Sequence, residues 1–223
     1  DVCIQNLHVI FAIYRAGLVG SDGETHQGIF DLSYLSSIPN MTVMAPKNKW
    51  ELSDMMKFAV RYDGPIALRY PRGEAYDGLS RFRLPIEYGK WETIYDENEI
   101  ALVAVGSMVK TAVEVRDRLR QMGYGCTLVN ARFVKPLDQE AIRTLQTEHQ
   151  LLVTMEENVK AGGFGEAVLE YLNEIKSQTR AMVIALPDDY VEHGNVDLLK
   201  QECGIDADSV VKKIVIEYIG LTK

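Results

Sequence analysis

The sequence lacks any hydrophobic run that approaches the roughly 20 residues a helix needs to cross a membrane. Positive charge is also in short supply, because 24 Lys and Arg stand against 32 Asp and Glu and give a formal net charge of -8. A surface that binds nucleic acid needs a basic face. We therefore expect neither a membrane nor nucleic acid as a partner, although a few local arginines would suffice to bind a phosphorylated metabolite.

Cysteine is scarce as well. Cys3, Cys126 and Cys203 are odd in number, lie far apart in the sequence and show no metal-ligand spacing. This pattern argues against a disulfide framework and against a metal site built on cysteine. We expect reduced, mostly buried thiols in a cytoplasmic protein.

The sequence also has no initiator methionine, and residues 1–6 resemble the tail of a helix that leads directly into a strand. A domain rarely begins in this way, so we expect that a further N-terminal part precedes the chain. The 223 residues, 47% of them hydrophobic, suit one large or two small globular domains with a substantial core.

What the sequence does contain is an alternation of apolar strands and amphipathic helices, which predicts an α/β fold with a largely parallel sheet. An irregular, polar stretch over 74–98 predicts a connector between two α/β units, because so long a connection is unusual inside a domain. The expected strands are 7–13, 41–45, 65–70, 100–105, 125–129, 151–155 and 181–186, and the expected helices are 29–35, 49–61, 111–122, 138–147, 163–175, 195–203 and 206–219.

The segment 14–28 combines four glycines with Arg15, Asp22 and His26 directly after the first expected strand. Loops at the ends of strands in open α/β proteins carry ligand chemistry. Glycine permits a positive φ and close backbone approach, while the three side chains supply a fixed charge, an acceptor and a proton switch. The same composition is also typical of a simple turn, so both interpretations remain open.

Two arginines are candidates for an anion clamp. Arg15 follows the first expected strand and Arg72 follows the third, and the ends of both strands are expected at one edge of the sheet. Paired guanidinium groups suit a phosphate or a carboxylate, because their planar forks bind oxyanions through two hydrogen bonds. The alternative is that Arg72 and the neighbouring Arg69 are ordinary surface or salt-bridge residues.

Asp22 and His26 are candidates for proton transfer. They are four residues apart, so they would share a face if the loop were helical there, whereas in an extended loop the fold must bring them together. A carboxylate near an imidazole can fix its tautomer and raise its pKa, which suits general acid and base catalysis.

A second glycine-rich segment, 161–165, follows the polar residues Glu156, Glu157 and Asn158. Its glycine spacing does not match the dinucleotide-binding pattern. The N-terminus of the helix that follows could hold an anion. We favour the other interpretation, which is close packing of strand and helix beside a solvated or interdomain acidic turn.

Runs of residues along the whole chain carry a family resemblance. Together they closely resemble the 1-deoxy-D-xylulose-5-phosphate synthases, thiamine-diphosphate enzymes of the transketolase superfamily. The match extends essentially from end to end, and the combination of 20–28 with 132–138 is specific. The runs are 20–28, 30–35, 38–41, 44–46, 69–73, 132–138, 156–158, 186–188 and 204–206.

The resemblance implies a division of the chain. Members of the family have three α/β domains. This chain would hold the remnant of a parallel-sheet pyrimidine-binding domain over 1–80, a linker over 81–98 and a transketolase-type C-terminal α/β domain over 99–223. The family forms homodimers, so the resemblance implies a homodimer here too.

The resemblance also implies an activity and its residues. The family condenses pyruvate with glyceraldehyde 3-phosphate, with release of carbon dioxide, in the first step of non-mevalonate isoprenoid synthesis. Asp22 and His26 match its catalytic acid and histidine, and Arg15 and Arg72 match arginines that bind the anionic ends of the substrates. The cofactors are thiamine diphosphate and Mg²⁺, whose sites belong mainly to the N-terminal part, so no complete cofactor site and no metal site is expected in this chain.

One position departs from the family pattern, since Tyr14 stands where the family usually has an aspartate beside the arginine. The change removes a carboxylate next to Arg15. Other interpretations remain open: another superfamily enzyme, such as transketolase or the β subunit of a 2-oxoacid dehydrogenase, or a non-catalytic binding or assembly module. We expect the chain alone to be inactive.

Overall fold

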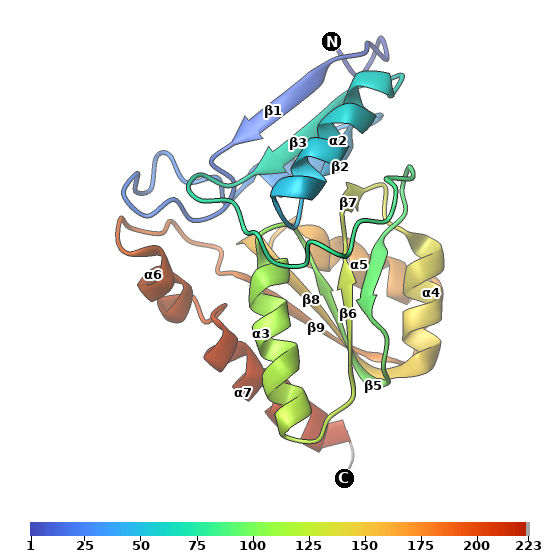
Figure 1. Ribbon diagram of the computed structural model, residues 1–223, viewed down its shortest axis with the longest axis vertical. Helices are drawn as coiled ribbons and strands as arrows, with labels where there is room; N and C mark the ends of the chain where they lie inside the picture. Colours follow the sequence, from blue (N-terminus) through green and yellow to red (C-terminus); the bar gives the residue numbers. More distant parts are fainter. Residues whose placement is uncertain (222–223) are drawn as a thin grey trace.

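The first of two β-sheets is built mainly from the N-terminal third of the chain. A computed structural model describes residues 1–221 and places this sheet above the second one (Figure 1). Its strand order is β1-β3-β2-β7, with β1 and β2 parallel to β3 and with β7 antiparallel to β2. Its elements are β1 (Ile10–Tyr14), α1 (Asp31–Ser36), β2 (Thr42–Met44), α2 (Lys49–Arg61), β3 (Ile66–Tyr70) and β7 (Phe133–Lys135).

The second sheet has the order β4-β6-β5-β8-β9 and is parallel except for the edge strand β4. Helices cover both of its faces, as a parallel sheet requires. Its strands are β4 (Glu92–Tyr95), β5 (Glu99–Ala104), β6 (Cys126–Asn130), β8 (His149–Val159) and β9 (Arg180–Leu186), and its helices are α3 (Met108–Gln121), α4 (Gln139–Glu148), α5 (Phe164–Glu174), α6 (Val196–Glu202) and α7 (Ala207–Leu221).

The strand period of two divides the apolar residues of the second sheet between two cores. In β5, Ile100, Leu102 and Ala104 pack into the core that contains α3 and α7. The alternate residues Ala101 and Val103 pack into the core that contains α4 and α5. The second of these cores continues into the first sheet, so the two α/β units share one apolar interior.

A buried ionic cluster also joins the two units. Lys47 Nζ lies 3.0 Å from Glu51 Oε1 and 2.6 Å from Glu92 Oε2, and Arg132 Nη2 contacts the same two oxygens at 2.8 and 2.9 Å. All four side chains are at most 2% exposed. The amide of Asn130 donates to both carboxylates. Burial of these charges is tolerated only because each has opposite charges and donors around it.

The predicted α/β class with parallel-dominated sheets is confirmed, but the prediction of an irregular connector over 74–98 is wrong for β4. Within the expected linker over 81–98, this four-residue strand already pairs with β6 of the second sheet. Its alternation is too short to stand out in the sequence. Strand β7 has only three residues and was not predicted either, although it completes the first sheet.

Strand β8 runs further than the sequence indicated. It extends to Val159, so Glu156, Glu157 and Asn158 lie in a buried strand end and not in a solvated turn. Polar residues are typical of loops, and the partners of Glu157 and Asn158, the amides of Leu18 and Leu32, lie far away in the sequence. None of the helices in the described part of the chain, 1–221, is both long and apolar enough to cross a membrane.

Candidate functional site

Arg15 and Arg72 meet at one carboxylate. Strand β1 pairs with β3 in parallel register, with Tyr14 opposite Tyr70, so the residues after both strands emerge at one edge of the sheet. There Asp22 lies between the two arginines, with Oδ2 3.2 Å from Arg15 Nε and Oδ1 2.8 Å from Arg72 Nη1. The structure thus brings together three of the four predicted site residues.

The net charge of this cluster is positive and can attract an anion. Two guanidinium groups and one carboxylate carry a formal charge of +1. The side chains of Arg15 and Arg72 are 39% and 44% exposed, whereas that of Asp22 is only 13% exposed. The arginines therefore have donors free to face an incoming phosphate or carboxylate while Asp22 fixes their relative position.

The backbone around Arg15 is unusual. Arg15 has a φ of +69°, a conformation that residues with a Cβ seldom adopt. Gly28 lies against it so closely that a Cβ at position 28 would come within 2.2 Å of the Arg15 carbonyl oxygen. Strained backbone of this kind persists where the surroundings enforce it, often at functional sites.

Tyr14 lies beside the arginine cluster, with the Arg15 Cζ 6.0 Å from the centre of its ring. Its ring is 53% exposed and packs 5.9 Å from the ring of Tyr70. Arg15 has its carboxylate partner in Asp22, eight positions from Tyr14 along the chain.

His26 lies on the same loop as Asp22 but not beside it on a helix. The glycine loop forms turns, so Asp22 and His26 do not share a helical face. The exposed imidazole of His26 has its Nδ1 2.8 Å from Thr25 Oγ1. Within the described residues no hydrogen bond or ion pair joins His26 to the arginine cluster.

The base of the glycine loop is closed by its own backbone and held by the second sheet. Gly17 and Gly28 exchange two hydrogen bonds, at 2.7 and 3.0 Å. Beside them the Leu18 amide donates to Glu157 Oε1 at 2.8 Å. Glu157 itself is buried at the end of β8, so an acidic residue of the C-terminal unit anchors the loop of the N-terminal unit.

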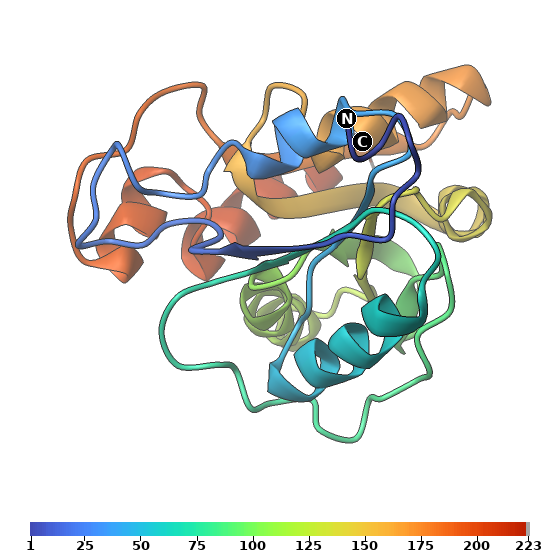
Figure 2. The same ribbon diagram turned by 90° about the horizontal axis from the view of Figure 1, so that it is seen from above.

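A second part of the C-terminal unit supports the far side of the loop. The Gln27 amide donates to the carbonyls of Val191 and Glu192 at 2.6 and 3.2 Å, and the Gly194 amide donates to the Gly20 carbonyl at 3.0 Å. Figures 1 and 2 show this orange segment beside the blue loop. No local pattern in the sequence identified these partners, because they lie more than 160 positions apart.

Arg69 is structural, as the alternative interpretation had it. Its guanidinium group is 2% exposed and lies 3.2 Å from the Asp31 carboxylate. It also donates at 2.8 Å to the carbonyls of Gly28 and Glu157, and so joins the loop to β8.

Glu156 is buried next to Glu157 but faces a different partner. Its two carboxylate oxygens accept the amides of Phe164 and Gly165 at the start of α5, at 2.8 and 2.7 Å. Burial raises the pKa of Glu156 to about 7, against the lowering effect of these two hydrogen bonds and of Arg69. The folded protein therefore binds a proton here more tightly than the unfolded chain does.

This raised pKa predicts a change of stability with pH. Between pH 4.5 and about 7 the unfolded chain releases a proton that folded Glu156 retains, so the wild type loses stability as the pH rises. Relative to Glu156→Gln, which does not titrate, the loss should reach about 3 kcal/mol. Urea unfolding of both proteins across this pH range measures it, and a difference that stays constant with pH would contradict it.

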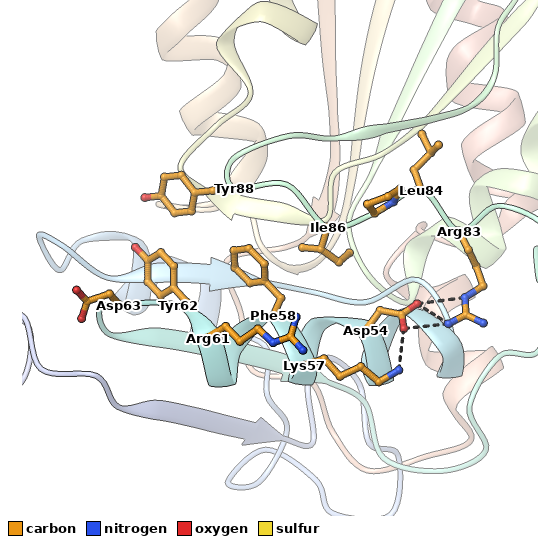
Figure 3. Close-up of a pocket in the computed structure, with 11 residues that line it drawn as sticks. Asp54, Lys57, Phe58, Arg61, Tyr62, Asp63, Arg83, Leu84, Ile86 and Tyr88 are labelled. Carbon is orange, nitrogen blue, oxygen red and sulfur yellow. Dashed lines mark hydrogen bonds and ion pairs between the residues drawn. The ribbon is translucent and has the colours of Figure 1, made fainter.

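A large cavity lies away from the arginine cluster. It encloses about 770 Å³ between α2 and the segment 83–88. At one end Asp54 pairs with Arg83, and at the other Tyr62 stacks on Tyr88 (Figure 3). None of the four predicted site residues lines it. Among the described residues, no group of three or more His, Cys, Asp or Glu is placed to hold a metal ion.

Two family models account for most of the chain. "Transketolase, pyrimidine binding domain" matches residues 1–77, and "Transketolase, C-terminal domain" matches residues 89–210. The chain belongs to the transketolase family. The C-terminal unit that anchors the glycine loop is thus the transketolase C-terminal domain.

The similar proteins include named synthases. The 1-deoxy-D-xylulose-5-phosphate synthase of Lachnoclostridium phytofermentans is 55% identical over 215 residues, which are 96% of this chain and 34% of that protein. That of Clostridium acetobutylicum is 44% identical over 220 residues, 96% of this chain and 35% of that protein. The chain therefore spans about a third of the length of the curated relatives it matches.

Two solved structures share the fold. One, titled "Split gene transketolase, inactive beta4 tetramer", superposes with a TM-score of 0.87 at 27% identity and covers 100% of this chain and 70% of that chain. The transketolase of Campylobacter jejuni superposes with a TM-score of 0.70 at 20% identity, over 92% of this chain and 31% of that chain.

Proposed function

We propose that the chain is the C-terminal part of a 1-deoxy-D-xylulose-5-phosphate synthase, which condenses pyruvate with glyceraldehyde 3-phosphate and feeds isoprenoid synthesis in the cytoplasm. The observation that carries the proposal is the convergence of Arg15 and Arg72 on Asp22. The identity of 44–55% to proteins named as this synthase supports it.

In this proposal the arginines bind the anionic ends of the two substrates. Glyceraldehyde 3-phosphate carries a phosphate and pyruvate a carboxylate, and each suits a guanidinium fork. Asp22 orients both arginines and lowers the net charge they present, which leaves a formal +1 to attract the substrates. The anchored end of the substrate then sets the position of its reacting carbon.

His26 is the residue we assign to proton transfer, together with Asp22. The exposed imidazole lies on the same loop as the anion-binding cluster and can exchange protons with a bound substrate. Thiamine diphosphate supplies the carbanion chemistry of this enzyme class when it is bound. Residues 1–221 contain no group of three or more His, Cys, Asp or Glu placed to hold the Mg²⁺ of that cofactor, so we derive no step through it.

We also propose that the chain self-associates. Strand β1 is an edge strand, and apolar side chains beside it are exposed, among them Ile4 at 85% and Tyr34 at 54%. Exposed apolar surface of this kind favours association. The split-gene relative, described as an inactive tetramer of β chains, supports both self-association and inactivity of such a chain by itself.

Arg72→Ala tests the anion-binding role. Loss of a charged donor should reduce kcat/KM for glyceraldehyde 3-phosphate by about 10- to 100-fold, mainly through KM, in enzyme completed with the N-terminal part of the L. phytofermentans relative. Arg83→Ala is the matched control, because Arg83 is also 44% exposed and paired with an aspartate. Equal effects of the two variants would refute the assignment.

Transketolase activity is the second candidate, favoured by the TM-score of 0.87 to a transketolase chain. The same completed enzyme distinguishes the two activities. Release of carbon dioxide from pyruvate in the presence of glyceraldehyde 3-phosphate supports the synthase, whereas transfer of a two-carbon unit from a ketose phosphate without that release supports transketolase.

A further inference from the structure

We propose that Glu157 of the C-terminal domain is a positioning residue that holds the glycine loop in the shape in which Arg15, Asp22 and Arg72 meet. The inference deepens the proposed function and rests on it for the meaning of the cluster. The geometry of Glu157 itself is independent of which substrate the cluster binds.

The carboxylate of Glu157 contacts the loop directly at its base. One oxygen accepts the Leu18 amide at 2.8 Å. Gly17 lies so near that a Cβ there would come within 2.5 Å of the Glu157 Cδ. The Leu18 side chain is buried in the core of the C-terminal domain, next to this contact. The chain is therefore fixed at Gly17 and Leu18, two and three residues after Arg15. Both Arg15 and Gly17 have a positive φ.

The C-terminal domain fixes the carboxylate in turn. The second oxygen of Glu157 accepts the Ser107 hydroxyl at 2.7 Å and lies 3.5 Å from Lys200 Nζ. Ser107 stands at the N-cap of α3, yet its side chain does not cap that helix. A serine in this position normally bonds a free amide of the helix. Here its hydroxyl orients Glu157, whose side chain is only 4% exposed.

Asp22 follows Leu18 in the loop, four residues after the contact with Glu157. Its pairing with both arginines depends on the direction that the backbone takes from Leu18 onward. The Gly17–Gly28 hydrogen bonds close the base, and the Glu157–Leu18 hydrogen bond joins that base to β8. If this bond is lost, the loop samples other paths and Asp22 spends less time between Arg15 and Arg72. Weaker anion binding follows without any change in the arginines themselves.

Glu157→Gln and Glu156→Gln form a matched pair on adjacent buried positions of β8. In Glu157→Gln the single amide oxygen can still accept from the Leu18 amide. No second carboxylate oxygen is left to accept from the Ser107 hydroxyl, and the negative charge that faces Lys200 is gone. Glu156→Gln changes the acceptor at the start of α5 and the charge that faces Arg69, but it leaves the hydrogen bond between Leu18 and Glu157 in place. Hydrogen exchange of the amides from Leu18 to Gln27, in the 223-residue chain, separates loop opening from global unfolding.

We expect Glu157→Gln to speed exchange in the loop by about tenfold, because the Leu18 amide then donates to a neutral amide in place of a charged carboxylate. Glu156→Gln should leave loop exchange within about twofold of the wild type, even where it lowers overall stability. Should Glu157→Gln fail to fold, Ser107→Ala removes one bond to the carboxylate and should speed loop exchange about threefold. Unchanged loop exchange in Glu157→Gln, or in Ser107→Ala if that variant replaces it, overturns the inference, as does equal acceleration in Glu156→Gln.

Titration of the same proteins with inorganic phosphate separates this inference from the proposed function. Wild type should bind phosphate, Arg72→Ala should bind it more weakly, and Glu157→Gln should lose about tenfold in affinity while Glu156→Gln does not. If Arg72→Ala binds phosphate as the wild type does, the anion-binding role fails, and loop exchange still decides the role of Glu157.

Discussion

Supplied with thiamine diphosphate, Mg²⁺, pyruvate and glyceraldehyde 3-phosphate, the 223-residue chain by itself should release no carbon dioxide above the uncatalysed rate. The physical reason is that the described residues do not form a metal site for the cofactor. The arginine cluster is the anion-binding site that we propose, but among the described residues no group of three or more His, Cys, Asp or Glu is placed to hold the metal of a cofactor diphosphate. Enzymes of ordinary efficiency turn over about 1 to 10³ times per second, so the expected difference from a complete enzyme is large.

The part of the L. phytofermentans relative that this chain does not match should restore turnover when the two are produced together. That part alone is the control, and it should also be inactive. Carbon dioxide release and the phosphorylated product are both measured. Full turnover by the 223-residue chain alone would refute the expectation and with it the proposal that the cofactor site lies mainly elsewhere.

Lys47→Met should lower the free energy of unfolding by about 3 to 5 kcal/mol, the usual cost of removing one partner from a buried ion pair. Without Lys47, the buried carboxylates of Glu51 and Glu92 would share Arg132 as their cation. Burial tends to raise the pKa of Glu92, but the Lys47 hydrogen bond and the Arg132 charge outweigh it and hold that pKa below its ordinary value. In Lys47→Met the pKa of Glu92 should therefore lie closer to its ordinary value.

Lys57→Met is the matched control for that measurement. Lys57 lies on α2, the helix that carries the Lys47 partner Glu51, and pairs with Asp54 at 3.3 Å, but its side chain is 68% exposed. An exposed pair contributes about 0 to 1 kcal/mol, so this variant should change stability little. Urea unfolding of both variants decides the matter. Similar losses in the two would show that the buried cluster does not join the two units as its geometry indicates.

Several features of the site could be predicted from the sequence because they depend on local pattern. Apolar periodicity located most strands and helices, and the ends of parallel strands share an edge, which placed Arg15 near Arg72. The glycines of segment 14–28 indicated tight turns, and positive φ values at Gly17, Gly20 and Gly23 agree with that.

The partners of those residues could not be predicted in the same way. The spacing of Asp22 and His26 does not show whether they meet, and the fold turns Asp22 toward the arginines. Glu156 and Glu157 resemble loop residues, because a charged side chain is normally exposed unless its partners are known. Their partners at Leu18 and Phe164 become visible only when the chain is folded.

The sequence by itself determined the α/β class, the family resemblance, the glycine loop and the two arginines at neighbouring strand ends. Only the tertiary structure decided that β7 completes the first sheet, that one apolar core serves both units, and that Glu157 anchors the loop. The physical reason is distance along the chain. Periodicity and turn chemistry act over a few residues, whereas a buried carboxylate is stabilised by donors that only folding brings within 3 Å.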